Sequence, residues 1–184
     1  PMVTTPGEVR RAREILGHAA HRLRRKRVPG AEALPPVGAM IEVPGAALAA
    51  DALAKTCDFF AIGSNDLTMY TLAIDRANEA VAHLFDPLHP AVLRLMQFSA
   101  EAGLRAGIPV SICGEIAGDP RFAALLVGFG IKELSMTATS IPRVKQRIRA
   151  MDALAARRRA LLIMDQTDSG RISMLLDDFN ALQE

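Results

Sequence analysis

Four polar residues that could do chemistry stand directly after apolar stretches of the chain. Glu42 follows one such stretch, Asn65 and Asp66 follow a second, and Cys113 follows a third. Carboxylates suit a hard cation such as Mg²⁺, which takes one or two carboxylates and fills its other positions with water and substrate oxygens. A thiol beside such a cation can act as a nucleophile or as a proton donor. The pattern therefore indicates a metal-assisted site with a reactive thiol.

Each of these residues also has a simpler explanation. Ser64, Asn65 and Asp66 are short polar side chains of the kind that cap the first turn of a helix. Free cysteine is among the most buried residue types and is usually inert. Cys57, which stands between Thr56 and Asp58 ahead of an apolar stretch, is interpreted in that way. From the residues alone, both explanations remain open for Asn65, Asp66 and Cys113.

The elements that must position these residues alternate along the chain. Apolar runs at 37–41, 58–62, 110–112 and 133–135 predict four buried strands. Helices are expected at about 5–27, 46–54, 67–74, 90–107, 120–128, from about 141, at 152–165 and at 171–182, with a loop at 29–36. This order predicts an α/β fold with a parallel sheet that is buried on both faces. The carboxyl ends of its strands meet at one edge, where the active sites of (β/α) barrels lie.

Length and composition limit the function classes. A chain of 184 residues, half of them hydrophobic, is expected to form one domain. No apolar run approaches the roughly 20 residues of a membrane span, and no secretory leader is expected. Its two cysteines fit neither metal-ligand spacing nor a disulfide framework, so a cytoplasmic location is expected. The basic run 22–27 suits the negative end of a helix, and because no aromatic residues interleave with it, nucleic acid is not an expected partner.

Five longer motifs resemble a known family. They are GAMIEVP at 38–44, DFFAIGSNDLTMYTLAIDR at 58–76, LHPAVLR at 88–94, CGEIAGD at 113–119 and LSM at 134–136. In this order they resemble the enzyme I family, the phosphoenolpyruvate–protein phosphotransferases of the bacterial phosphotransferase system. The pyruvate phosphate dikinases and phosphoenolpyruvate (PEP) synthases are the alternative branch, and the residues 74–76 and 113–119 favour enzyme I. The tail at 167–180 is more similar to the nitrogen-related version of enzyme I than to the sugar version.

The resemblance implies a fold and a partner set. Residues 1–184 are expected to be part of a PEP-utilising barrel domain, with a helical extension from about residue 152. The fold is then the second half of a (β/α)8 barrel of the TIM type, with about four parallel strands, plus C-terminal helices. In this family the phosphoryl group of PEP passes to a histidine on another domain and then to a histidine phosphocarrier protein. A homodimer is also implied.

The resemblance also implies a role for each candidate site residue. Glu42 and Asp66 match the Mg²⁺ ligands, and Asn65, Asp66 and Arg76 match residues that bind PEP. Cys113 matches the catalytic acid that protonates the methylene carbon of enolpyruvate. His18, His21, His83 and His89 lie outside the phosphohistidine motif and are interpreted as surface or packing residues.

Some features depart from the family. Met69 stands where the signature usually has glutamine, and Ala61 where it usually has serine. A half barrel leaves an apolar face and two sheet edges open, so the isolated chain is expected to associate and to be inactive by itself. Two other functions compete with catalysis by a phosphotransferase. One is a non-catalytic dimerisation or regulatory module, and the other is a magnesium-dependent lyase, which would explain the carboxylates but not the motif at Cys113.

Overall fold

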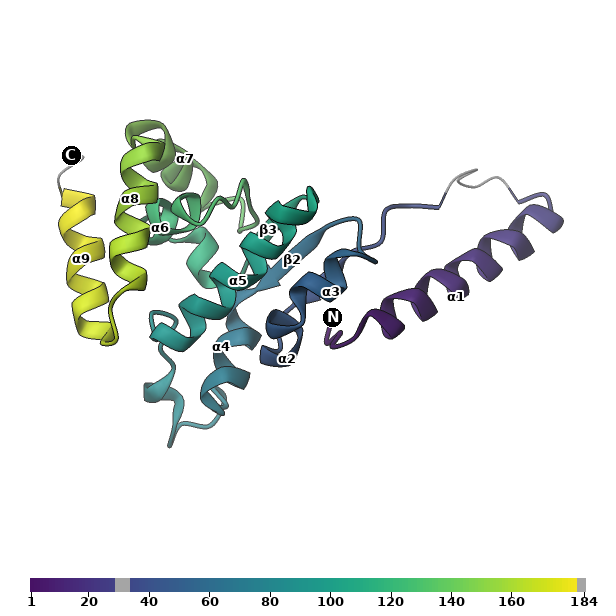
Figure 1. Cartoon of the computed structure of the whole chain (residues 1–184), viewed down its shortest axis with the longest axis horizontal. Helices are drawn as coiled ribbons and strands as arrows, with labels where there is room; N and C mark the ends of the chain where they lie inside the picture. The colour runs from purple at the N-terminus through teal and green to yellow at the C-terminus, as the bar shows by residue number, and fades with distance from the viewer. Residues whose placement is uncertain (29–33, 182–184) are drawn as a thin grey trace.

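A computed structural model describes residues 1–28 and 34–181, so residues 29–33 of the expected loop lie outside the described residues. It contains a parallel sheet of four strands in the order β1-β2-β3-β4, of which β2 and β3 are labelled in Figure 1. The strands are β1 (Ala39–Ile41), β2 (Phe60–Gly63), β3 (Val110–Cys113) and β4 (Glu133–Leu134). All four predicted strands are present, and their boundaries differ from the predicted ones by one or two residues.

The helices follow the expected alternation with one exception. They are α1 (Pro6–Arg25), α2 (Pro44–Leu48), α3 (Ala50–Ala54), α4 (Ser64–Leu72), α5 (Pro90–Ala106), α6 (Ala123–Gly128), α7 (Ile141–Ala150), α8 (Ala153–Met164) and α9 (Ser169–Ala181), with short 3₁₀ turns η1 (Ala82–Leu84), η2 (Glu115–Gly118) and η3 (Pro120–Phe122). The prediction of one helix at 46–54 is wrong. Two short helices meet at Ala49, whose φ of −95° and ψ of 11° lie outside the helical region.

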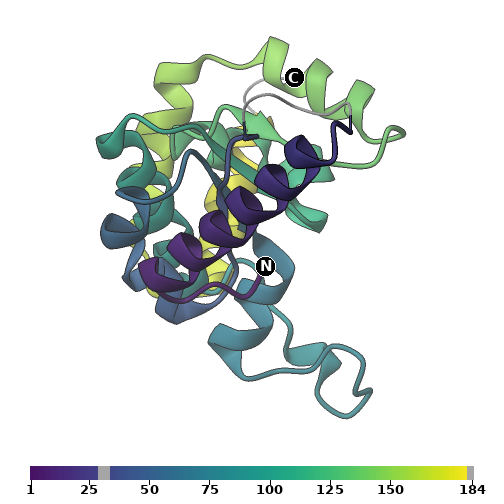
Figure 2. The ribbon, with the colours of Figure 1, turned by 90° about the vertical axis from the view of Figure 1, so that its right-hand side faces the viewer.

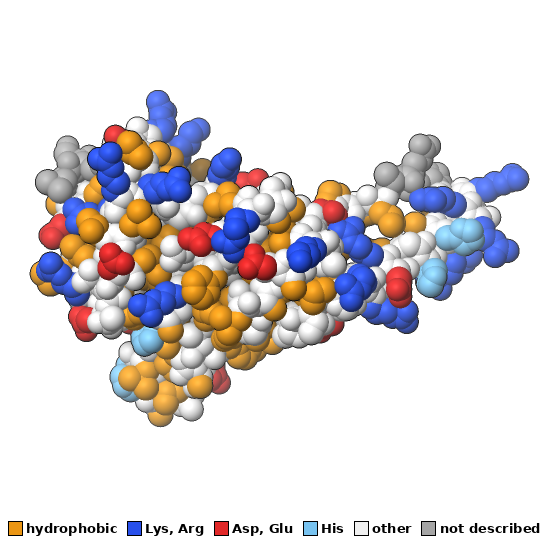
Figure 3. Space-filling view, in the orientation of Figure 1, with side chains coloured by type: hydrophobic (Ala, Val, Ile, Leu, Met, Phe, Trp, Pro, Cys, Tyr) orange, Lys and Arg blue, Asp and Glu red, His pale blue; other side chains and the backbone are white. Residues whose placement is uncertain are grey.

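Local signals at helix ends are used as the sequence predicts. The Glu8 carboxylate accepts hydrogen bonds from the backbone N–H of Thr5 at 2.7 Å and of Thr4 at 2.9 Å, so the expected capping box starts α1. These bonds favour the charged form and lower the pKa of Glu8 to about 2. Arg22, Arg24 and Arg25 lie in the last turn of α1, where the blue side chains gather in Figure 3.

The core lies on one face of the sheet. Ile41, Phe60 and Ile62 have 0% exposure and belong to one apolar cluster with side chains of α2, α3 and α5. On the opposite face of the same strands, Met40 and Ala61 are only half-buried. The expectation of burial on both faces therefore holds for one face. The other face lacks a covering layer among the described residues.

The C-terminal helices form a separate layer against α6. A side chain at Gly128 would lie 2.6 Å from Cβ of Ala160, so this glycine allows α6 and α8 to approach closely. α9 is attached through Asp177, whose carboxylate accepts from the Arg121 guanidinium at 2.6 Å and 2.9 Å. Figure 1 shows α8 and α9 side by side at the end of the molecule away from α1.

The fold class predicted from the sequence is confirmed as an α/β chain with four parallel strands and C-terminal helices. The arrangement is consistent with the second half of a (β/α)8 barrel. None of the helices in residues 1–28 and 34–181 combines the length and the apolar character that crossing a membrane requires.

Candidate active site

The predicted site residues lie at the carboxyl ends of three neighbouring strands. Glu42 follows β1, Asn65 and Asp66 follow β2, and Cys113 ends β3. β1 pairs with β2, and β2 pairs with β3 in a register that places Gly63 opposite Cys113. Because all three strands are parallel, these residues lie together at the carboxyl-terminal end of the sheet, which we call the mouth.

Helix capping does not account for the polar residues after β2. α4 begins at Ser64, so Asn65 and Asp66 lie inside its first turn rather than before it. The Ser64 hydroxyl donates to the Cys113 carbonyl at 2.7 Å, and the Asn65 side-chain oxygen accepts from the Glu115 backbone N–H at 3.2 Å. Both side chains therefore join the segment after β2 to the segment after β3.

Gly114 allows these two segments to meet. Its φ of +101° lies in the region that side chains disfavour, and an added Cβ would overlap the Ser64 hydroxyl and lie 3.0 Å from the Asn65 side-chain oxygen. Glycine is thus required for both conformation and space. The motif Cys113-Gly114-Glu115 therefore allows the two segments to pack closely and also supplies chemical groups.

The two carboxylates at the mouth have different surroundings. Glu42 is buried at 5% exposure, and its Oε1 accepts from the backbone N–H of Met2 at 2.6 Å. Asp66 is half-buried, and within residues 1–28 and 34–181 no hydrogen bond or ion pair involves its carboxylate. One carboxylate is therefore fixed in place, and the other keeps its oxygens available.

The Cys113 thiol lies at the carboxyl end of β3, on the same half-buried face of the sheet as Met40. Its Sγ is 3.5 Å from the Ile62 carbonyl oxygen and 4.0 Å from the Met40 sulfur. Burial raises the pKa of this thiol, and the negative charges of Glu42 and then Asp66 raise it further. Since a raised pKa keeps the thiol protonated near neutral pH, this environment favours a proton donor over a nucleophilic thiolate.

Arg76 reaches the mouth from the segment after α4. Its Nη1 lies 2.7 Å from Oε1 of Glu115, and its guanidinium carbon lies 5.9 Å from the centre of the Phe85 ring. The sequence analysis included Glu115 only within the motif at 113–119 and gave it no role. Its place directly after Cys113 and Gly114 is the signal that could have indicated a role for Glu115. No pattern in the sequence indicates its pairing with Arg76.

The mouth offers two carboxylates, of the kind that hold a magnesium ion. Among the described residues, no group of three or more His, Cys, Asp and Glu side chains is arranged to hold a metal. Mg²⁺ does not need such a group, because one or two carboxylates and substrate oxygens suffice. Glu42 and Asp66 are near enough to the same thiol for both charges to act on its pKa.

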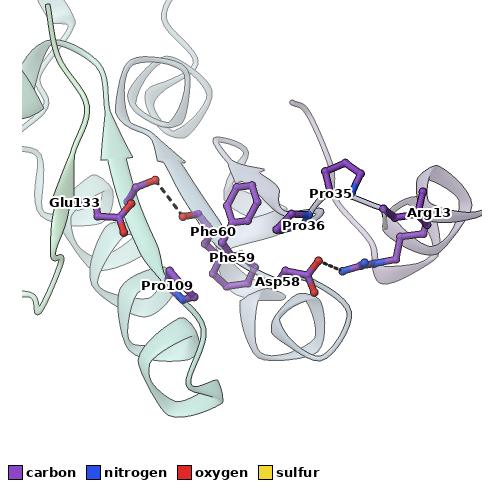
Figure 4. A pocket seen from close by; sticks show the side chains of 10 residues that line it. Arg13, Pro35, Pro36, Asp58, Phe59, Phe60, Pro109 and Glu133 are labelled. Carbon is purple, nitrogen blue, oxygen red and sulfur yellow. Dashed lines mark hydrogen bonds and ion pairs between the residues drawn. The ribbon is translucent and has the colours of Figure 1, made fainter. Parts of the chain in front are cut away.

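A pocket among the described residues lies away from the mouth. A hollow of about 710 Å³ lies at the amino-terminal ends of the strands, where Asp58, Phe59 and Pro109 line it (Figure 4). The Asp58 carboxylate there forms an ion pair with Arg13 of α1 at 2.8 Å. None of the mouth residues lines this hollow. It belongs to the uncovered part of the sheet and not to the candidate site.

The remaining sequence-predicted residues have plain locations. His89 accepts a hydrogen bond from the backbone N–H of Ala91 through Nδ1 at 3.2 Å and so caps α5, while His18, His21 and His83 are exposed. Their interpretation as surface or packing residues is confirmed. Met69 is a half-buried residue of α4.

Comparison with known proteins identifies the family. Residues 1–153 match the family described as "PEP-utilising enzyme, PEP-binding domain". The chain belongs to this family. The match ends where α8 begins, so the last two helices lie beyond it.

Individual members of the family are similar over most of this chain. A phosphoenolpyruvate-protein phosphotransferase of Cupriavidus necator is 47% identical over 151 residues, 80% of this chain and 25% of the relative. The protein of that name from Buchnera aphidicola subsp. Baizongia pistaciae is 38% identical over 179 residues, 97% of this chain and 31% of the relative. A multiphosphoryl transfer protein of Xanthomonas campestris is 46% identical over 156 residues, 84% of this chain and 18% of the relative. The chain thus spans between 18% and 31% of the length of these three relatives.

Proposed function

We propose that this chain is the part of an enzyme I-type phosphotransferase that binds PEP and protonates its enolpyruvate product. The observation that carries the proposal is the convergence of Glu42, Asp66 and Cys113 at one mouth, where both carboxylates raise the pKa of the thiol. The names of the relatives support PEP as the phosphoryl donor. The acceptor is a histidine on another domain, followed by a histidine phosphocarrier protein.

The proposed roles follow from the chemistry of each group. Glu42 and Asp66 would hold Mg²⁺, which when bound neutralises charge on the phosphate and carboxylate of PEP. Arg76 would bind an anionic group of PEP, because a guanidinium forms paired hydrogen bonds with phosphate and carboxylate oxygens. Asn65 would donate a hydrogen bond to the same substrate through its side-chain amide.

Cys113 completes the reaction after the phosphoryl group has moved. The bond between phosphorus and the enol oxygen breaks, the phosphorus bonds to the acceptor nitrogen, and enolpyruvate remains. Transfer of the Cys113 proton to the methylene carbon then gives pyruvate and leaves a thiolate, which regains its proton from solvent. A thiol whose pKa is raised by burial and two carboxylates is protonated when this step needs it.

The competing function is a non-catalytic dimerisation module, and the uncovered sheet face favours it. Met40 and Ala61 are half-buried on that face, and β1 and β4 are the edges of the sheet. We propose that the isolated chain forms a homodimer that covers this surface and is inactive by itself. Light scattering at micromolar concentration tests this, and a single monomer mass would contradict it.

A cytoplasmic location is part of the proposal, since both cysteines are free thiols.

The deciding experiment is calorimetric titration of this chain with PEP in the presence of Mg²⁺. The Glu42→Gln and Asp66→Asn variants keep side-chain size but remove the charge that a cation needs, so we expect both to abolish Mg²⁺-dependent binding. Glu133→Gln is the matched control, because Glu133 is an exposed carboxylate that lines the hollow at the other end of the sheet. Binding that survives in both mouth variants, or that is absent from the unaltered chain at millimolar PEP, would contradict a PEP site in this chain.

A further inference from the structure

We propose that Glu115 is a positioning residue that holds Arg76 in the ligand-free site and competes with the anionic ligand for it. The inference rests on the proposed function, because it concerns the arginine assigned to PEP. It adds a residue that regulates how readily this arginine is released. Its basis is the set of contacts that Glu115 makes with two different segments of the mouth.

Glu115 contacts two of the residues assigned to bind PEP, Arg76 and Asn65. Its side-chain Oε1 lies 2.7 Å from Nη1 of Arg76, and its backbone N–H donates to the Asn65 side-chain oxygen at 3.2 Å. Only one guanidinium nitrogen takes part in the ion pair. The carboxylate therefore orients the arginine through a single contact, which a ligand that engages two nitrogens can replace.

The two partners are not equally fixed. Glu115 starts the short helix η2, directly after Gly114, whose backbone packs against Ser64 and Asn65. Arg76 lies in the segment 73–81, where residues 75–80 are exposed and which extends away from the body of the molecule in Figure 2. The carboxylate is thus presented by the more firmly held segment. The arginine is the partner that can change position when a ligand arrives.

Two effects of the Glu115 charge oppose anion binding. The ion pair must break before both terminal nitrogens of the guanidinium can donate to a ligand. The carboxylate also repels an anion placed close to it. The side chains of Arg76 and Glu115 are 41% and 71% exposed, so solvent screens both effects. An exposed ion pair of this kind changes an equilibrium by about two- to fivefold.

Glu115→Gln is the variant that separates charge from shape. Glutamine retains an oxygen that can accept from Nη1 of Arg76, so the arginine keeps its location while the negative charge is removed. We expect this variant to bind PEP with Mg²⁺ about two- to fivefold more tightly than the unaltered chain, with a smaller gain at high salt. Glu79→Gln is the matched control, because Glu79 is an exposed acid in the same segment as Arg76, and we expect no gain from it.

A double-mutant cycle with Arg76→Gln shows whether Glu115 acts through the arginine. In that background only the general repulsion remains, so the gain from Glu115→Gln should shrink. An equal gain in both backgrounds would overturn the positioning role. Unchanged or weaker binding by Glu115→Gln in the unaltered background would also overturn it, while the PEP site itself would stand.

A second measurement decides the matter even if the unaltered chain binds no PEP. The Nη protons of Arg76, of which those on Nη1 face Glu115, can be followed by nuclear magnetic resonance in the ligand-free chain. If Glu115 holds the guanidinium, Glu115→Ala, which removes the acceptor, will speed hydrogen exchange at these protons more than Glu79→Ala does. Equal exchange in the two variants would overturn the inference. Absence of PEP binding together with faster exchange would refute the proposed function of the chain but support the contact.

Discussion

The four strands present two very different surfaces. Toward α2, α3 and α5, the side chains of Ile41, Phe60 and Ile62 have 0% exposure and form the core. Toward the other side, the alternating residues Met40 and Ala61 are half-buried and lead to the Cys113 thiol. Because successive side chains of a strand point to opposite faces, one short stretch supplies both surfaces. Stability and chemistry are thus divided residue by residue within each strand.

Two substitutions at neighbouring positions of β2 test this division most strongly. Ile62→Ala removes a side chain with 0% exposure and leaves a cavity, so we expect the free energy of unfolding to fall by about 2–5 kcal/mol. Ala61→Ser, on the other face, should change it by less than about 0.5 kcal/mol. Urea denaturation followed by circular dichroism measures both. A large loss from Ala61→Ser would mean that a second copy covers this face in solution.

The contact between the segments after β2 and β3 is tested by Gly114→Ala. Positive φ disfavours the new side chain, which would also overlap the Ser64 hydroxyl, so we expect a loss of about 1–3 kcal/mol in unfolding free energy and weaker PEP binding. Gly107→Ala is the control, because Gly107 has a φ of +72° but no atom within 4 Å of an added Cβ. If the two variants lose the same free energy of unfolding, the segments after β2 and β3 are not in tight contact at Gly114.

A smaller effect is expected in the titration of Cys113. Burial and the charges of Glu42 and Asp66 raise its pKa, so alkylation by iodoacetamide should have its midpoint above that of an ordinary cysteine thiol. Asp66→Asn should lower this midpoint because it removes a negative charge. Peptide mass spectrometry separates Cys113 from Cys57. An unchanged midpoint in Asp66→Asn would show that this carboxylate does not face the thiol.

The same shift carries a stability prediction with a definite sign. The folded chain keeps the Cys113 proton to higher pH than the unfolded chain does. The contribution of the protonated Cys113 thiol to the free energy of unfolding is therefore complete below the pKa of the unfolded thiol. It is lost as the pH rises through the higher pKa of the folded state.

Some of these features could be predicted from the sequence because their causes are local. Four apolar runs bounded by glycine and polar residues predicted the strands, and the capping box from Thr5 to Glu8 predicted the start of α1. Parallel strands then required Glu42, Asn65 and Cys113 to share one edge. The candidate site followed from strand order alone, before any contact was known.

Other features depend on contacts that no local pattern encodes. The break at Ala49 occurs within a run of alanines that favours helix, so helix propensity does not indicate it. Arg76 and Glu115 are 39 positions apart and both exposed, and neither periodicity nor burial indicates their ion pair. The hydrogen bond from Met2 to Glu42 is equally distant in sequence, at 40 positions.

The strand order has a consequence for how the chain can fold during synthesis. Because the spatial order β1-β2-β3-β4 is also the order along the chain, each new strand pairs only with the strand made just before it. No strand has to wait for a later one to be inserted between its neighbours. The sheet can therefore grow from one edge as the ribosome releases the chain, with β2 in place before β3 emerges. The mouth is then completed when the segment after Cys113 leaves the ribosome, well before α8 and α9 are made.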